Sequence, residues 1–439
     1  MKKRENIITD ERLSLVRAAR REKRERFYAE HIAKLGAEAT DELRRICDSY
    51  DERYYIWLAS LWDCERGGFY AFPSGRDTEG YLPDLESTGQ ILRVIECSGL
   101  ISAVGEKYGR DLPEKMKNDI IRFTSSLEDK DDGYFYHPQW GKDITVSRRG
   151  RDCTWACNTI LGAFGAKAPY PTALDRLSGE DKPESVPEHF KSLSAYKQYL
   201  IDRNINGNSY VVGNTMQAQA PQILSAGPEY VRATAEWLSE YQKPNGLWEE
   251  QVNYQSVNGL MKLSLLCSDI GISVPNCYAA LESAIFAALS DEPITFCCQF
   301  YNPLITISLI LKNIEEREGA VRAEEVRAPL TLRAAELIRV TRRKLHTCMR
   351  SDGVFMYNTT IGGGYKSQGA AVAVPYTDEG GVNATTICLR GVMLHLCDDI
   401  GIPMVPIFCE EDGKLFFELI DNAEPIKKTN PRIPGIELK

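Results

Sequence analysis

The chain has 439 residues, of which 43% are hydrophobic and 26% charged, and its formal net charge is −9. This is the composition of an ordinary globular protein, and the acidic balance argues against a chain built as a whole to hold nucleic acid. No apolar run reaches the roughly 18 residues that a membrane-spanning helix needs, so we expect no membrane span.

The N-terminus and the cysteines indicate the compartment. Residues 1–5 are Met-Lys-Lys-Arg-Glu, with no apolar segment behind the basic residues, so we expect no signal peptide and a cytoplasmic location. The thirteen cysteines include no CxxC pair, and several of them lie within apolar helical runs. We therefore expect buried free thiols, no metal site and no other cofactor.

Residues 1–50 are predicted to form a charged helical arm. Between residues 10 and 48 the chain is dense in Arg, Lys, Glu and Ala, with sparse apolar positions such as Leu13, Val16 and Phe27. That pattern predicts one or two helices with a narrow apolar stripe. We expect the arm to pack on the outside of the protein; the alternative is an arm that joins two copies in a homo-oligomer.

A repeated unit organises residues 51–401. It consists of a polar turn with a glycine, an aromatic residue, a short loop and an apolar helix that opens on small polar residues. The clearest copy runs from residue 244 to residue 271, and the turn glycines are Gly67, Gly133, Gly246 and Gly353. Two weaker copies are predicted at residues 206–210 and 299–303. Such a unit buries its apolar face only by stacking on its neighbours, so we expect one mainly α domain of about six helical hairpins.

Two segments depart from this pattern. Residues 166–187 contain four prolines and cannot continue a helix, which predicts a surface excursion or a lid. After residue 401, two apolar runs at 404–408 and 414–419 are joined by Glu-Glu-Asp-Gly, which predicts a small β-hairpin followed by an extended tail. We therefore divide the chain into residues 1–50, 51–401 and 402–439.

The turns Gly-Gly-Phe at 67–69 and Gly-Leu-Trp at 246–248 each precede a helix that opens with Ser, Thr or Asn. This layout resembles the repeats of α/α-toroid proteins over most of residues 60–401. One such group comprises the six-hairpin glycosidases and the toroidal polysaccharide lyases; the other comprises the terpenoid cyclases and prenyltransferases. The resemblance implies an α/α toroid whose cavity is lined by the glycine turns and by the starts of the inner helices.

The first candidate cluster follows the second turn and contains Arg148, Arg149, Arg151, Asp152 and Trp155. Arginine binds carboxylates with two parallel hydrogen bonds, and an indole stacks on a sugar ring, so this cluster suits an acidic sugar. Asp152 would then move a proton. The alternative is a solvated loop in which Asp152 caps the following helix.

The second candidate cluster follows the third turn. Glu249 is the proton-transfer candidate, Trp248 and Asn253 are candidates for contacting a sugar, and Tyr254 would support the chemistry. A pair of carboxylates, one protonated and one ionised, is what cleavage of a glycosidic bond requires. The alternative is that Trp248 packs in the core while Glu249 caps the turn.

The third cluster lies in an unusually long loop and contributes Tyr376, Glu379 and Asn383. The resemblance to toroidal lyases implies a Tyr or His base beside an Asn or Arg that neutralises a uronate. His137, which follows the second turn, is the histidine that we expect nearest a cavity.

We therefore predict a carbohydrate-active enzyme, a hydrolase or a lyase, that acts on a small oligosaccharide able to carry a uronate. Two alternatives remain. Residues 129–132 match the Asp-x-Asp-Asp of class II terpene cyclases, which would place an apolar cavity around Asp131. A non-catalytic toroid that binds a ligand or a protein partner is the other. The layout alone does not decide among them, because one fold hosts many functions.

Overall fold

The computed structural model describes residues 6–101, 112–173, 175, 187–360 and 364–433. It is mainly helical, as the sequence predicts. The named strands in these residues form two short antiparallel pairs: β1 (Trp62–Asp63) with β2 (Gly68–Phe69), and β3 (Lys366–Ser367) with β4 (Ala370–Ala371). Within the same residues, no helix combines the length and the apolar character needed to cross a bilayer.

The helices are connected by turns and loops of varied length. In chain order they are α2 (Asp10–Cys47), α3 (Glu52–Ser60), α4 (Pro73–Asp77), α5 (Leu85–Ser98), α6 (Glu114–Ser126), α7 (Val146–Thr154), the π-helix η1 (Trp155–Leu161), α8 (Gly162–Phe164), the 3₁₀-helix η2 (Glu188–Phe190), α10 (Leu193–Asp202), α11 (Ser209–Ala218), α12 (Ala220–Ala226), α13 (Pro228–Tyr241), α14 (Tyr254–Asp269), α15 (Cys277–Leu289), α16 (Cys298–Glu318), α17 (Ala320–Leu332), α18 (Ala334–Cys348), α19 (Val382–Thr386), the π-helix η3 (Ile387–Gly391), α20 (Val392–Asp399) and α21 (Glu410–Asp421).

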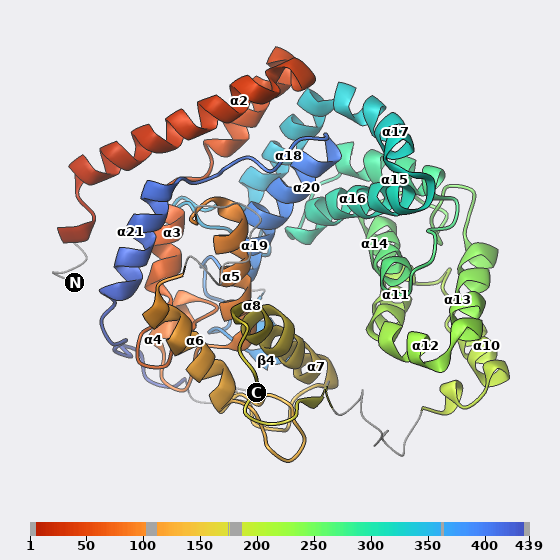
Figure 1. Cartoon of the computed structure of the whole chain (residues 1–439), viewed down its shortest axis with the longest axis horizontal. Helices are drawn as coiled ribbons and strands as arrows, with labels where there is room; N and C mark the ends of the chain where they lie inside the picture. Colours follow the sequence, from red (N-terminus) through yellow and green to blue (C-terminus); the bar gives the residue numbers. More distant parts are fainter. Residues whose placement is uncertain (1–5, 102–111, 174, 176–186, 361–363, 434–439) are drawn as a thin grey trace.

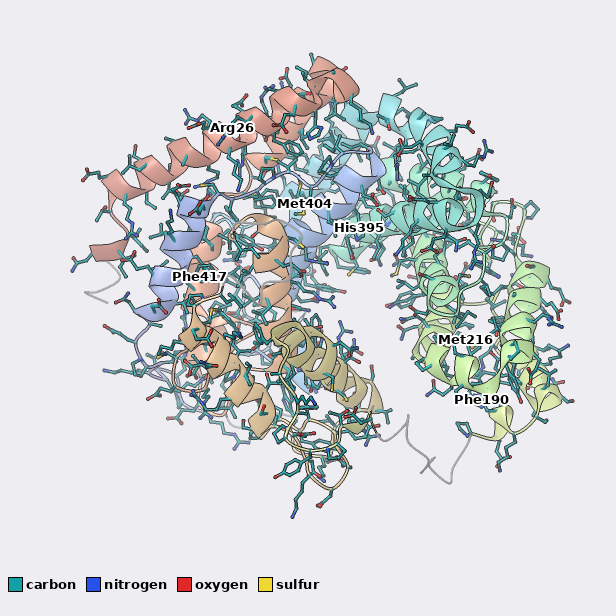
Figure 2. All side chains as sticks on the ribbon, in the orientation of Figure 1. Arg26, Phe190, Met216, His395, Met404 and Phe417 are labelled. Atoms are coloured by element: carbon teal, nitrogen blue, oxygen red, sulfur yellow. The ribbon has the colours of Figure 1, made fainter. Side chains whose placement is uncertain are left out.

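One series of helices packs side by side through the molecule. In this series η1 packs on α5, α5 on α19, α20 on α16, α16 on α14 and α14 on α11. Outside it, α18 packs on α2 and on α15. The helices form an arc around a common centre, with α7 and α8 at one end and α10 to α13 at the other (Figure 1). His395 on α20 and Met216 on α11 mark the middle and one end of the series (Figure 2). Closure of this arc into a toroid stays a prediction.

The repeated turns have the predicted backbone. All four turn glycines have a positive φ, a conformation that residues with a side chain adopt only at a cost: Gly67 (86°), Gly133 (73°), Gly246 (76°) and Gly353 (85°). At Gly246 the packing adds a second reason, because a Cβ there would lie 2.1 Å from the backbone nitrogen of Ala280 on α15. The glycine therefore lets the turn rest directly against the neighbouring helix.

Two predicted elements are wrong. Residues 299–303, expected as a turn, lie inside α16, which continues through Pro303. The predicted C-terminal β-hairpin is instead the helix α21. Its acidic run forms the first turn, in which the Asp412 carboxylate accepts from the Cys409 nitrogen at 3.0 Å. Leu415, Phe416 and Leu419 then bury one helical face.

The arm, α2, consists of two helical segments that meet at Gly36, where the backbone is not helical, and Arg44 of the second segment pairs with Glu25 of the first. It packs on α18 and α21, and its Arg20 is buried between the carboxylates of Glu52 and Asp412, at 2.8 and 3.2 Å. The C-terminal tail lies beside α4: the Asn430 nitrogen donates to the Asp77 carbonyl at 3.0 Å. Most of the proline-rich segment 166–187 lies outside the described residues.

Candidate functional site

A polar cavity of about 240 Å³ lies where the start of α5 meets α7, α19 and the loop that carries β3. Phe72 and Tyr357 contribute aromatic surface. The remaining lining is rich in charged and amide side chains, among them Asp84, Glu86, Gln90, Arg151, Lys366 and Asn383. This mixture of hydrogen-bond donors and acceptors suits a ligand that is itself covered with polar groups.

The start of α5 places two carboxylates at this cavity. Asp84 is the N-cap residue, and its carboxylate accepts from the Ser87 nitrogen at 3.0 Å and from the Ser87 hydroxyl at 2.7 Å. Glu86 therefore falls in the first turn, and Gln90 follows one turn later on the same face. The Gln90 amide donates to the Asn383 side chain of α19 at 3.0 Å, which joins the two walls of the cavity.

Arg148 is the centre of the site. Its side chain is fully buried, and three carboxylates bind its guanidinium. Asp84 lies 3.0 Å from Nη2, Glu86 lies 3.0 Å from Nη1, and Asp152, one turn further along α7, lies 3.0 Å from Nε. The guanidinium also lies over the ring of Trp140, 4.5 Å from its centroid. Such complete engagement fixes the position of all three carboxylates.

A second arginine completes this group on the cavity side. The Nε of Arg151 lies 2.7 Å from Oε1 of Glu86, and 41% of the Arg151 side chain is exposed. The Ser367 hydroxyl, which belongs to β3, donates to the other oxygen of Glu86. Residues of α7 and of the loop that carries β3 therefore both bind the Glu86 carboxylate. We call Asp84, Glu86, Arg148, Arg151 and Asp152 the Arg148 cluster.

The Arg148 cluster contains more carboxylates than arginines. Burial raises the pKa of Asp152 to about 7; Arg148 opposes this rise, whereas the negative charges of Asp84 and Glu86 add to it. Only one Asp152 oxygen meets Arg148, and the buried Oδ1 has no hydrogen-bond partner among the described residues. Burial and the two neighbouring carboxylates therefore favour the protonated form of Asp152.

The first predicted cluster is divided by the structure. Arg151 lines the cavity, and Asp152 lies behind it on Arg148. Trp155 is buried instead, with the Arg93 guanidinium 4.6 Å from its ring centroid. Arg149 points elsewhere and lies over the ring of Tyr134, at 4.9 Å.

The other two carboxylates predicted for catalysis cap helices. Glu249 accepts from the Ser209 nitrogen at 2.8 Å and from its hydroxyl at 2.7 Å, at the start of α11. Glu379 binds the nitrogen and the hydroxyl of Ser74 in the same way, in the first turn of α4. Burial raises the pKa of both carboxyl groups, and their bonds to serine oppose the rise. Neither residue lines the cavity beside Arg148, so the structure does not bring the three predicted carboxylates together.

The remaining residues of the second cluster support the fold. Trp248 is buried and donates from its indole nitrogen to the Leu238 carbonyl at 3.1 Å. Asn253 is the N-cap residue of α14, in a reciprocal pair of bonds with Ser256. The Tyr254 hydroxyl donates to the Glu292 carbonyl at 2.9 Å, and burial raises its pKa.

His137 and Tyr376 lie away from the lining of the cavity beside Arg148, whereas Asn383 belongs to it; His137 lines a separate pocket with Glu65 and Pro138, as expected of a histidine near a cavity. The Nε2 of His137 lies 2.6 Å from the Pro83 carbonyl, and its Nδ1 accepts from the Gln139 nitrogen at 3.2 Å. Burial lowers the pKa of His137 to about 3, so the imidazole is neutral and both of its nitrogens are engaged. Tyr376 is 78% exposed.

The acidic run at residues 129–132 forms the second repeat turn. The Asp129 carboxylate accepts from the nitrogens of Asp131 and Asp132, at 3.0 and 3.3 Å, and lies 2.7 Å from Lys142. Asp132 accepts from the Tyr136 hydroxyl at 2.9 Å. The run therefore satisfies the turn's own donors, as polar turn residues commonly do. In the part of the chain that is described, no group of three or more His, Cys, Asp or Glu side chains is placed to hold a metal ion.

Sequence reasoning missed Asp84, Glu86 and Gln90. The signal was present, because residues 84–90 open the first repeat helix, as Asn253 opens the third. A carboxylate at the N-cap and another in the first turn is an ordinary helix start, so the pattern suggested capping alone. Residues 84–90 do not include Arg148, the residue that binds both carboxylates; Arg148 lies on α7.

Comparison of the chain with protein-family models, with curated proteins and with solved structures gave no match.

Proposed function

We propose that this chain is a glycoside hydrolase that cleaves a small oligosaccharide in the cavity beside Arg148. One observation carries the proposal: three carboxylates converge on a single buried guanidinium, and two of them, Asp84 and Glu86, line the cavity. Glycosidic bonds are cleaved by paired carboxyl groups, one that gives a proton and one that stabilises or attacks the sugar. The Arg148 cluster offers such a pair at the cavity wall.

The raised pKa of Asp152 supports acid catalysis near neutral pH. Asp152 shares Arg148 with the cavity-lining pair, and burial raises its pKa to about 7. Carboxyl groups that share one cation are electrostatically coupled, so a proton on one of them changes the charge felt by the others. Asp84 and Glu86 act on the substrate in this proposal. Asp152 is a positioning residue that sets the protonation of the group.

The cavity suits a sugar. Its volume of about 240 Å³ lies just below the roughly 300–1,000 Å³ of pockets for larger ligands, which favours a group the size of one sugar ring. Gln90 and Asn383 offer amide groups to hydroxyls, and Tyr357 offers an aromatic ring. The cytoplasmic location predicted from the sequence would favour a small oligosaccharide over a polymer.

Hydrolysis is favoured over elimination because the one tyrosine among the described lining residues, Tyr357, is a poor phenolic base. Burial, together with the neighbouring Cys298, raises the pKa of Tyr357, the tyrosine at the cavity wall. Forming a phenolate there is therefore costly. Of the other bases considered, Tyr254 donates its hydroxyl proton to a carbonyl and His137 is fully engaged.

The proposal is tested by following the release of reducing ends from a panel of neutral and uronate-containing oligosaccharides. We expect Glu86→Gln to lower kcat by about 10²–10⁴-fold, the usual contribution of a proton-transfer group. Glu52→Gln is the matched control, because Glu52 is also a buried carboxylate in the first turn of a helix, bound to the buried Arg20. Absence of cleavage across the panel, or an equal loss in both variants, would overturn the proposal.

A non-catalytic role for the same cavity predicts a different result. Sugar binding would then be measurable by titration calorimetry, and Glu86→Gln would weaken it, while no oligosaccharide of the panel is cleaved. The cyclase alternative receives no support from the 129–132 turn, whose carboxylates are engaged by backbone, Lys142 and Tyr136.

A further inference from the structure

A second pocket, of about 460 Å³, is lined by both segments of α2 and by the residues that follow them, up to Glu52. It shares no lining residue with the cavity of the proposed active site. Arg17, Arg21 and Arg24 line it from one face of the first segment, since they follow one another at the spacing of helical turns. Arg44 lines it from the second segment. This concentration of arginine stands out in a chain whose net charge is −9.

The carboxylates of the pocket do not match all of its arginines. Three of the four carboxylates among its described lining residues are bound by arginines within 3.1 Å: Glu52 by Arg17 and Arg20, Glu25 by Arg44, and Asp51 by Arg53. The fourth, Asp48, is 79% exposed and lies 3.8 Å from Nη1 of Arg24, which is too long for a hydrogen bond. Arg21 and Arg24 are therefore left without a close counter-charge from the described residues.

Arg24 is a buried cation with an unused donor group. Its side chain is 7% exposed, and its Nε and Nη2 donate to the carbonyls of Ile407 and Tyr50, at 3.1 and 3.0 Å. Nη1 makes no hydrogen bond within the described part of the chain. Buried charges in proteins are normally paired with an opposite charge, so Nη1 at the pocket wall points to an anion from outside the chain.

Arg21 lies one helical turn before Arg24 and lines the same pocket. It is exposed, and it forms no hydrogen bond or ion pair with any residue that the structure describes. Side chains three positions apart on a helix are neighbours, so one anion can accept hydrogen bonds from both guanidinium groups.

We propose that this pocket binds a phosphate group, carried by a free small molecule or by a lipid headgroup, between Arg21 and Arg24. Phosphate is favoured over a carboxylate because its oxygens can accept from two planar guanidinium groups at once. The pocket volume lies within the roughly 300–1,000 Å³ of ligand pockets, so it leaves room for the molecule that carries the phosphate. The pair of Arg20 with Glu52 stays intact, and the inference does not depend on the proposed function.

The test measures binding of inorganic pyrophosphate by titration calorimetry at fixed ionic strength, because salt screens such interactions. We expect the native protein to bind pyrophosphate and to melt at a higher temperature in its presence. Arg21→Met should weaken binding about tenfold or more, the effect of losing one charge-assisted hydrogen bond. The unliganded variant should melt like the native protein, because Arg21 has no described partner.

Two further variants sharpen the test. Asp48→Asn should tighten binding severalfold, because it removes the carboxylate nearest Arg24, which repels an anion. Arg26→Met is the matched control and should change nothing: Arg26 is another exposed arginine of α2 (Figure 2), but it lies outside the pocket lining and 3.9 Å from Glu22.

A flotation assay with vesicles of phosphatidylcholine, with and without phosphatidic acid, separates the two sources of the phosphate. Vesicle binding that requires phosphatidic acid and that Arg21→Met abolishes assigns the phosphate to a lipid headgroup. Pyrophosphate binding without vesicle binding assigns it to a free small molecule. If neither probe binds, or if Arg26→Met weakens binding as strongly as Arg21→Met, the phosphate site is wrong.

Discussion

Two buried arginines, Arg148 and Arg20, organise two clusters of similar composition in different parts of the molecule. Arg148 binds three carboxylates beside the cavity. Arg20 binds Glu52 and Asp412 and ties the arm α2 to α3 and α21. Both arrangements bury charge, and both leave a carboxyl group whose pKa burial raises, Asp152 in one and Asp412 in the other. A perturbed pKa alone does not tell them apart.

The two clusters differ in the number of carboxylates that bind each arginine. Glu52 is bound by Arg17 as well as by Arg20, and although burial opposes them, these bonds lower its pKa to about 2. The surface pocket beside Arg20 is also lined by Arg17, Arg21, Arg24 and Arg44. Three carboxylates share Arg148, and burial raises the pKa of one of them, Asp152, to about 7. Under the proposed function, the Arg20 cluster is therefore a structural tie and the Arg148 cluster is the one that supplies protons.

The largest expected effect follows from removing each arginine in turn. Arg148→Met and Arg20→Met should each lower the free energy of unfolding by about 3–5 kcal/mol, because each leaves buried carboxylates without a counter-charge. Only Arg148→Met should abolish activity per folded molecule. Denaturant unfolding gives the first quantity and the oligosaccharide assay the second. Equal activity in the folded fractions of both variants would remove the distinction between the clusters; Arg148→Lys serves where Arg148→Met does not fold.

A smaller effect is expected in the pH dependence of stability. Burial raises the pKa of Asp152 from about 3.9 in the unfolded chain to about 7, so the folded state binds one proton more between these values. Stability therefore falls as the pH rises from about 4 to about 7, by about 4 kcal/mol if Asp152 acts alone. Asp152→Asn should flatten this fall, as measured by urea unfolding at several pH values. Identical profiles for the two proteins would contradict a raised pKa at Asp152.

The glycine turns and the helix α21 show which features of the molecule can be predicted from the sequence. The turns at Gly67, Gly133, Gly246 and Gly353 were found because a positive φ leaves a local trace, a glycine beside a polar residue. The helix α21 was missed because the Gly413 of its first turn follows three acidic residues, which is equally the pattern of a hairpin turn.

The candidate site was predicted only in part, for a physical reason. Asp152 and Arg151 were identified because four charged residues follow one another around them. Asp84 and Glu86 were not, because their chemistry depends on Arg148, more than sixty residues away in the chain. A carboxylate that caps a helix and one that serves a cavity look alike in sequence, since both favour the first turn.

The smallest expected effect concerns the two carboxylates that the sequence favoured. Glu249→Gln and Glu379→Gln each keep an oxygen that can accept from the serine nitrogen at the start of α11 or α4. Each should therefore cost about 1 kcal/mol of stability or less, and kcat should stay within about threefold of the native value. The decisive observation is the order of the three variants in one assay. If Glu249→Gln or Glu379→Gln lowers kcat more than Glu86→Gln does, the proton chemistry belongs to a helix cap and the Arg148 cluster is the structural element.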